Sequence, residues 1–254
     1  MLSGIEGILE NKRHVVERVI DWRKVLFKEK MLYDKFLIRT QRIMEVMCGS
    51  GARISSLSHM CREIIGVEPD YGLFKEASDR SSSIPNVTLM NCDLLSQELS
   101  RDVKDGSLDA VLLMGNQLPK IVNVDNLEKT FKKIYSLLAK DGIVILSVFN
   151  YDRVLMAGHH DFEKVRFRIK DQDLFLSRNM KIFDEDILRY TMSIYTLSGK
   201  HVKEHTELQS ILTKKALENW LKHTGFINIE IFGDFDMRDF SPETSSKMVV
   251  VAKK

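Results

Sequence analysis

The chain has 254 residues, enough for one large α/β domain with a modest elaboration. Hydrophobic residues make up 44% of it and charged residues 29%, and a formal net charge of +2 without a long basic block counts against a dedicated nucleic-acid binder. Three cysteines without zinc-ligand spacing, no signal-peptide pattern and no apolar run of about 20 residues predict a cytoplasmic protein without disulfides, metal site or membrane span.

In the first half of the chain, a helical sequence pattern is followed by a pattern in which predicted strands alternate with predicted helices. From Ile5 to about Leu37, apolar residues recur at helical spacing among charges. Short β-branched runs then appear, each followed by a helical stretch, and they predict five strands: Arg42–Met47, Glu63–Val67, Val87–Met90, Leu108–Met114 and Ile143–Phe149. Strands that alternate with helices predict a parallel sheet with right-handed crossovers.

The second half begins with a different pattern. After Asp152, polar and apolar residues alternate, which predicts an antiparallel insertion. Its strands are Lys164–Ile169, Leu174–Phe183, Ile187–Thr196 and His201–Leu212, with a hairpin turn at residues 197–200. A helix follows from Thr213, a typical N-cap, to Thr224, and Gly225 ends it. Two closing strands are predicted at Phe226–Phe232 and Lys247–Ala252.

The segment most informative about function is a glycine turn directly after the first predicted strand, Glu45-Val46-Met47-Cys48-Gly49-Ser50-Gly51. Gly49 and Gly51 let the backbone approach a bound cofactor without a clash at Cβ. The dinucleotide fingerprint requires a third glycine, but this chain has Arg53 or Ile54 at the later position. An acid before the turn favours a cofactor that carries an amino-acid group, because Glu45 can attract its ammonium.

Two further acids follow the next two predicted strands. Glu68 lies roughly 20 residues beyond the glycines, where an acid can accept hydrogen bonds from both ribose hydroxyls. Asp93, after the third strand, can accept a hydrogen bond from an adenine amino group. Taken alone, Glu68 is also typical of a loop carboxylate and Asp93 of a helix N-cap. Three acids at one sheet edge, beside a glycine turn, together predict a site for an adenosyl cofactor.

These motifs resemble those of a known enzyme family. The glycine turn, Val67-Glu68-Pro69-Asp70 and Cys92-Asp93-Leu94 are similar to successive motifs of class I S-adenosylmethionine-dependent methyltransferases. Leu108-Asp109-Ala110-Val111 and Leu138-Ala139-Lys140-Asp141-Gly142 fit the same family, so the resemblance covers about residues 41–150. It implies a Rossmann-like α/β fold with a seven-stranded sheet, mostly parallel and with the last strand antiparallel.

The resemblance also implies a cofactor and the residues that bind it. The cofactor is S-adenosylmethionine, and its product is S-adenosylhomocysteine. The cofactor-binding positions are Arg23, Glu45, Met47, Cys48, Gly49, Gly51, Glu68, Pro69, Cys92, Asp93, Leu94, Met114, Gly115 and Asn116. Met47 is a departure, because the family usually has Gly or Ala there. An exposed helix arginine is an equally simple interpretation of Arg23.

Two short sequence segments indicate a subgroup of this family. Met114-Gly115-Asn116-Gln117-Leu118 and Phe149-Asn150-Tyr151-Asp152-Arg153 are similar to strings of the glycine and sarcosine N-methyltransferases and their small-molecule relatives. The chain departs from that group at Gln117, Lys120 and Phe149, where the missing arginine removes a substrate-carboxylate contact. The resemblance implies catalytic roles for Asn116, Asn150 and Tyr151 in orienting the acceptor. Alternatively, residues 150–152 form a turn that leads into the insertion.

The predicted function is methyl transfer from S-adenosylmethionine to a small molecule, with an amine as the favoured acceptor. The alternatives are an O-methyltransferase, an RNA or protein methyltransferase, and a non-catalytic adenosyl-binding protein. We expect a helical cap at residues 1–40, a cofactor-binding core at 41–152 and 213–254, and a substrate lid at 153–212. We expect no membrane or nucleic-acid partner, and the sequence leaves a homo-oligomer open.

Overall fold

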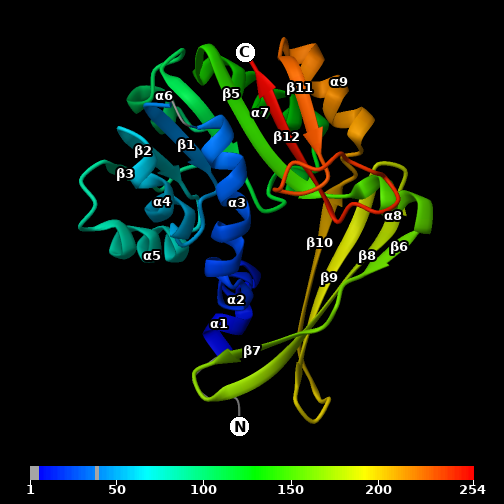
Figure 1. Cartoon of the computed structure of the whole chain (residues 1–254). Coiled ribbons are helices and arrows are strands. Elements are labelled where there is room, and N and C mark those ends of the chain that lie inside the picture. Colours follow the sequence, from blue (N-terminus) through cyan, green and yellow to red (C-terminus); the bar gives the residue numbers. More distant parts are fainter. Residues whose placement is uncertain (1–5, 38–39) are drawn as a thin grey trace. The chain divides into compact units, whose positions relative to one another are not determined.

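The computed structural model describes residues 6–37 and 40–254 (Figure 1). The parts of the predicted helical cap at residues 1–5 and 38–39 lie outside the described residues. The chain forms two compact units. The smaller unit joins the segment up to Asp21 to Arg153–Ile211, and the larger unit consists of Trp22–Asp152 and Leu212–Lys254.

The larger unit contains a seven-stranded sheet in the order β11-β12-β5-β4-β1-β2-β3. Its strands are β1 (Arg42–Val46), β2 (Glu63–Val67), β3 (Val87–Met90), β4 (Leu108–Leu113), β5 (Leu138–Phe149), β11 (Ile227–Phe232) and β12 (Lys247–Lys253). The strands β1 to β5 run parallel to one another, whereas β12 is antiparallel to both β5 and β11. The predicted mostly parallel, seven-stranded sheet is confirmed.

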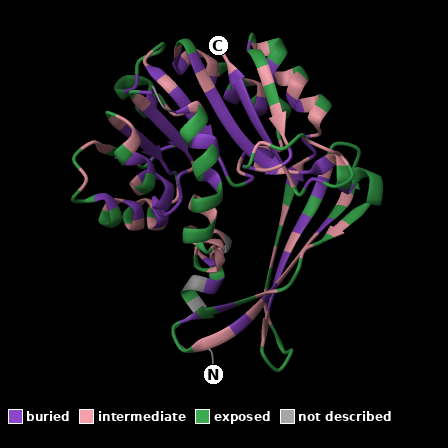
Figure 2. Cartoon of the chain, in the orientation of Figure 1, coloured by how far each residue is buried: buried purple, intermediate pink, exposed green. Residues whose placement is uncertain are grey.

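The central strands are buried along most of their length, as the purple ribbons of Figure 2 show. Near-continuous apolar runs are expected of parallel strands that helices cover on both faces. β5 begins earlier than predicted, because Leu138 already pairs with Leu108 while Ile143 pairs with Ala110. The residues between them bulge, and Gly142 fits there because a Cβ would lie 3.0 Å from the Leu108 carbonyl oxygen.

The helices of the larger unit are α3 (Trp22–Phe36), α4 (Ala52–Leu57), α5 (Tyr71–Ser81), α6 (Gln97–Asp102), α7 (Val124–Leu137) and α9 (Lys214–Thr224), with single 3₁₀ turns η1 (Ser58–Met60) and η2 (Leu118–Lys120). α4 packs against α3 and α5, and α7 packs against α9. Leu32 and Leu37 bury their side chains in the core beside β1 and α4. This packing explains why the chain from Trp22 onward groups with the sheet.

Within the described residues 6–37, the predicted N-terminal helical segment forms three helices, of which α1 (Glu6–Glu10) and α2 (Lys12–Val19) belong to the smaller unit. Asn11 begins α2, since its side chain accepts a hydrogen bond from the Arg13 amide. At Ile20 the backbone is extended, with φ −69° and ψ 122°, and this residue separates α2 from α3.

The smaller unit also holds the predicted antiparallel insertion. Its strands are β6 (His159–Asp161), β7 (Val165–Ile169), β8 (Gln172–Asp184), β9 (Ile187–Thr196) and β10 (His201–Ser210), ordered β10-β9-β8-β6 with β7 also paired to β8. The helix α8 (Tyr151–Ala157) leads into it. The hairpin is confirmed, because the Thr196 amide donates to the Lys200 carbonyl at 2.9 Å and Gly199 has φ 84°.

The caps of α9 are the predicted ones. The Thr213 side chain accepts a hydrogen bond from the Ala216 amide, and Gly225 ends the helix in the left-handed conformation with φ 109°. Across residues 6–37 and 40–254, no helix is both long and apolar enough to span a membrane.

Candidate functional site

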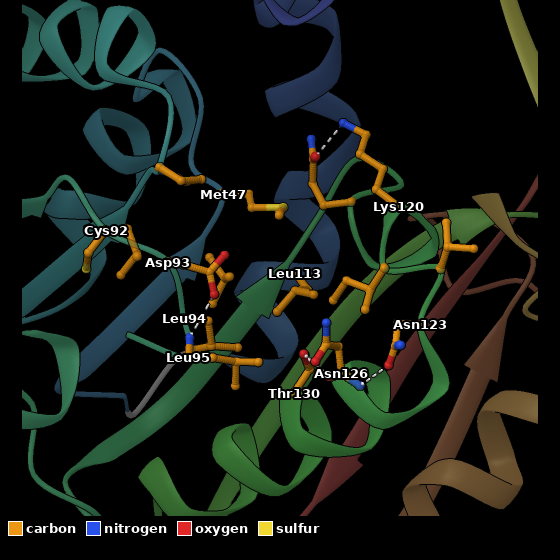
Figure 3. Close-up of a pocket in the computed structure, with 16 residues that line it drawn as sticks. Met47, Cys92, Asp93, Leu94, Leu95, Leu113, Lys120, Asn123, Asn126 and Thr130 are labelled. Carbon is orange, nitrogen blue, oxygen red and sulfur yellow. Dashed lines mark hydrogen bonds between the residues drawn. The ribbon is translucent and has the colours of Figure 1, made fainter. Parts of the chain in front are cut away.

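A pocket of about 290 Å³ opens at the carboxyl edge of the larger sheet, where β1 to β4 end beside the start of α7 (Figure 3). Side chains of Val67, Leu94 and Leu113 supply apolar walls, and the exposed carboxylate of Asp93 lines the same space. The volume is at the lower end of the range for small-molecule sites. In open α/β sheets, ligands bind at this edge.

The glycine turn after β1 has the backbone conformation that its sequence predicts. Gly49 has φ 60° and Gly51 has φ 74°, both in the left-handed region. At Gly51 a Cβ would also lie 2.9 Å from the Cβ of Ala77. Because Gly51 has no side chain, α4 can pack closely on α5. For the same reason, no side chain covers the backbone at the start of α4.

Glu68 is fully buried behind this turn. Its Oε2 accepts a hydrogen bond of 2.9 Å from the Gly49 amide, and its Oε1 accepts one of 2.8 Å from the Asp70 amide. The carboxylate thus ties the loop after β2 to the loop after β1. Pro69, the next residue, lines the pocket.

Met47 lines the pocket and is half-buried, with φ 56°. A side chain other than glycine in the left-handed region is strained. The backbone here therefore favours glycine, one of the two residues that the methyltransferase family usually has at this position.

Glu45 belongs to a buried ion cluster between β1, α3 and α4. It accepts a hydrogen bond from Arg53, whose guanidinium also binds Glu29 at 2.8 and 3.0 Å. The hydroxyl of Tyr33 donates to Glu29 at 2.9 Å. Burial lowers the pKa of Arg53, but the two carboxylates outweigh it and hold this pKa well above its usual range. Glu45 is 1% exposed and is not among the residues that line the pocket.

Residues that follow β3 line the pocket, at the sheet edge where the sequence predicts them. Cys92 and Leu94 are buried and line it, and burial raises the pKa of the Cys92 thiol. The Oδ1 atom of Asp93 accepts a hydrogen bond of 2.9 Å from the Leu95 amide (Figure 3). Asp93 therefore combines a local backbone contact with a place in the pocket wall. Cys48, by contrast, lies in the hydrophobic core.

The two strings after β4 and β5 contact each other. The Oδ1 atom of Asn116 accepts hydrogen bonds from the Phe149 amide at 2.9 Å and from the Tyr151 hydroxyl at 3.2 Å. The Gly115 amide donates to the Ser147 hydroxyl at 2.9 Å. Tyr151 is fully buried and Asn116 is 7% exposed. These contacts fix the end of β4 against the end of β5.

The structure places Asn150 against a different segment. Its Nδ2 donates to the carbonyls of Pro242 at 2.8 Å and Ser245 at 2.9 Å. Met114 lies in the core, and Arg23 is an exposed side chain of α3. The predicted residues that do not line the described pocket are Arg23, Glu45, Cys48, Gly49, Gly51, Glu68, Met114, Gly115, Asn116, Asn150 and Tyr151.

Several pocket residues were missed by the sequence interpretation, and they lie around η2 and the start of α7. Gln117 and Lys120 are joined by a hydrogen bond of 2.6 Å. Asn123 caps α7 by accepting a hydrogen bond of 3.0 Å from the Asn126 amide, and Thr130 lies one turn farther along the wall. The available signal was Asn123 as an N-cap before an amphipathic helix, in the connection that follows β4.

The chemistry of the lining fits an adenosyl group. Val67 and Leu113 offer apolar surface to a purine ring, and the Asp93 carboxylate offers an acceptor to its amino group. The exposed carboxylate of Asp93 disfavours a phosphate at this wall, because like charges repel.

Comparison with known proteins agrees with this geometry. Residues 43–142 match the family described as a methyltransferase domain. The chain is 23% identical to a glycine/sarcosine N-methyltransferase of Aphanothece halophytica, over 98% of this chain and 89% of that protein. An S-adenosylmethionine-dependent methyltransferase from Clostridium acetobutylicum ATCC 824 superposes with a TM-score of 0.71 at 16% identity, over 94% of each chain. An S-adenosylmethionine-bound amino pentose methyltransferase from Micromonospora echinaspora superposes with a TM-score of 0.65 at 14% identity, over 93% of each chain.

Proposed function

The chain is a class I S-adenosylmethionine-dependent methyltransferase, and from that premise we propose that it methylates the nitrogen of a small-molecule amine. The observation that carries this proposal is the hydrogen bond from the Tyr151 hydroxyl to Asn116. It joins the two strings through which the chain resembles the glycine and sarcosine N-methyltransferases. The similarity to the Aphanothece enzyme along nearly the whole chain supports the same acceptor class.

S-adenosylmethionine supplies a methyl group that is already activated on its sulfonium. Residues of the pocket can hold the adenosyl part: Val67, Cys92 and Leu94 as apolar surface and Asp93 as acceptor for the amino group. The turn at Gly49 lies at the same sheet edge, and its backbone carries no side chain that could clash with a cofactor. Glu68 supplies the acid for the ribose hydroxyls and also holds this turn.

The work left to the protein is alignment and exclusion of water, because displacement at a methyl group depends on the direction and distance of approach. The acceptor amine must arrive neutral, with its lone pair free. Asn116 and Tyr151 are buried and hold β4 and β5 together. This arrangement suits them to position the surface against which an acceptor is placed. We therefore assign them a positioning role in the proposed reaction.

The test is methyl transfer from isotope-labelled S-adenosylmethionine to glycine, sarcosine and an amino sugar, in parallel with a catechol, bulk tRNA and a protein extract. Mass spectrometry of the product then locates the new methyl group. We expect transfer to the nitrogen of an amine, and loss of transfer in the Glu68→Ala variant. Methylation confined to the catechol oxygen, the tRNA or the protein would contradict the proposal, and S-adenosylhomocysteine binding measured alongside confirms that the cofactor site is intact.

A further inference from the structure

Among the described residues that line the pocket of the larger unit, only Asp93 and Lys120 have charged side chains. Asp93 follows β3, and Lys120 is the last residue of η2, in the connection that follows β4. In the sheet order β4-β1-β2-β3, two strands separate β4 from β3. Neighbouring strands lie about 4.8 Å apart, so β3 and β4 are roughly 14 Å apart. The pocket therefore has an acidic end beside β3 and a basic end beside β4.

A hydrogen bond to a neutral group orients the cation at the basic end. The Lys120 ammonium donates to Oε1 of Gln117 at 2.6 Å, and both side chains are half-buried. Because an amide carries no net charge, it orients the ammonium without cancelling its charge. Figure 3 shows Lys120 and Asp93 on opposite sides of the pocket, with Met47 between them. A ligand that extends from Asp93 past Met47 therefore meets the charge of Lys120.

The cofactor of this enzyme class has its own groups in a matching order. Its purine and its amino-acid group lie at opposite ends, joined through the ribose and the sulfur. When the adenine amino group meets Asp93, the amino-acid group is directed toward Met47 and Lys120. The carboxylate is the one anionic group of the cofactor, and a charge-assisted hydrogen bond to an ammonium is about twice as strong as a neutral one.

The sequence interpretation offered a different cation for the cofactor, Arg23. In the structure Arg23 is an exposed side chain of α3, and it is not among the residues that line the described pocket. Glu45, which was predicted to attract the cofactor ammonium, is buried against Arg53. The charged positions expected from the resemblance therefore do not form the wall at this end of the pocket, whereas Lys120 does.

We propose that Lys120, oriented by Gln117, binds the carboxylate of the cofactor's amino-acid group. Lys120 is then a specificity-determining residue, which selects S-adenosylmethionine and S-adenosylhomocysteine over adenosyl ligands that have no carboxylate. In this the chain departs from the family that it resembles, because the contact comes from η2 and not from α3. The inference concerns the cofactor alone and holds whichever acceptor is methylated.

The test is calorimetric titration with S-adenosylhomocysteine, its decarboxylated analogue and 5′-methylthioadenosine, which lacks the whole amino-acid group. We expect the wild type to bind S-adenosylhomocysteine at least about tenfold more tightly than the decarboxylated analogue. Lys120→Met should weaken S-adenosylhomocysteine binding by about tenfold, but it should not weaken binding of the other two ligands, because neither has a carboxylate. Lys120→Arg should keep part of the preference, since a guanidinium also binds a carboxylate.

Two further variants separate this lysine from other cations. Arg23→Met tests the alternative contact from α3 and should keep the wild-type preference for the carboxylate. The matched lysine control is Lys104→Met, because Lys104 is exposed and precedes β4 at the end of the strand opposite to the pocket. Lys104→Met should change all three affinities by less than about twofold.

Loss of the preference in Arg23→Met with the preference kept in Lys120→Met would overturn the inference. So would a wild type that binds the decarboxylated analogue as tightly as S-adenosylhomocysteine. Binding of 5′-methylthioadenosine is the folding control, and equal weakening of all three ligands by Lys120→Met would replace the carboxylate contact by a structural role. A wild type that binds none of the three ligands would overturn the cofactor assignment as well. If amines are not methylated but the preference depends on Lys120, only the N-methylation proposal fails.

Discussion

The Gly49 amide donates a hydrogen bond of 2.9 Å to the Oε2 atom of Glu68. The other oxygen of this fully buried carboxylate accepts from the Asp70 amide at 2.8 Å. Glu68 was predicted to be an acid for the cofactor ribose, and the structure adds that it shapes the glycine turn. A change at this residue should therefore alter both the fold and the proposed cofactor contact.

We expect Glu68→Gln to weaken S-adenosylhomocysteine binding by at least about tenfold, or about 1.4 kcal/mol. The free energy of unfolding should fall by about 1–3 kcal/mol, because a side-chain amide has one acceptor oxygen for two buried backbone donors. Calorimetry and urea denaturation measure the two effects. Glu63→Gln is the control at the other end of β2, where Glu63 pairs with Arg42 at the rim. Wild-type affinity in Glu68→Gln would contradict the assignment.

Met47 provides a test of the left-handed turn. Its φ of 56° strains any side chain with a Cβ. We expect Met47→Gly to be more stable than Met47→Ala by about 1 kcal/mol, since both lose the same pocket contacts and only glycine relieves the strain. Chemical denaturation of the two variants gives the difference directly. An alanine variant as stable as the glycine variant would show that the turn adopts another conformation.

Sequence patterns predicted those parts of the fold that are determined locally. The bounds of β2 and the N-cap Thr213 agree with the structure because each depends on neighbouring residues. The contacts of Arg53 could not be predicted from local sequence patterns. In the sequence it marked only a missing third glycine, whereas in the structure it joins Glu45 to Glu29, 24 residues earlier. That pairing depends on the packing of α3 against α4.

In the candidate site, too, local position along the chain could be predicted from the sequence, whereas contacts between distant residues could not. The end of β3 predicted that Asp93 and Cys92 would meet at the sheet edge, and both line the pocket. The position of Asn150 after β5 also follows from the sequence, but the direction of its side chain does not. That direction is fixed by carbonyl groups of Pro242 and Ser245, 92 and 95 residues farther along the chain.

The buried cluster of Arg53 makes a prediction about stability. Arg53→Met should lower the free energy of unfolding by about 3–5 kcal/mol, because Glu29 and Glu45 then face each other's charge without the guanidinium. Arg42→Met is the control, since Arg42 forms a partly exposed pair that contributes about 0–1 kcal/mol. Combining Arg53→Met with Glu29→Gln and Glu45→Gln should recover part of the loss. Urea denaturation that shows equal losses for Arg53→Met and Arg42→Met would refute the cluster's role.

Asp93 should select the purine. An amino group donates to its carboxylate, whereas the oxygen of an inosyl analogue is repelled by it. We expect the wild type to prefer S-adenosylhomocysteine over S-inosylhomocysteine, and Asp93→Asn to reduce that preference by about tenfold, because a side-chain amide can also donate. The asparagine can keep the contact with the Leu95 amide, so the turn is retained. Asp125→Asn, at an exposed position in the first turn of α7, should leave the preference unchanged. An unchanged preference in Asp93→Asn would place the purine elsewhere.

Tyr151→Phe distinguishes a positioning role from a catalytic one. The change removes the hydroxyl that donates to Asn116 at 3.2 Å, while the Phe149 amide still binds the same Oδ1 atom. A positioning residue should therefore lower kcat by less than about tenfold and stability by about 0.5–1.5 kcal/mol. The pH profile of kcat and the affinity for S-adenosylhomocysteine should stay as in the wild type. A hydroxyl that transfers a proton would instead cost about 10²–10⁴ in rate and change the pH profile. Tyr71→Phe, at a side chain that is 69% exposed on α5, is the matched control and should leave all of these quantities unchanged.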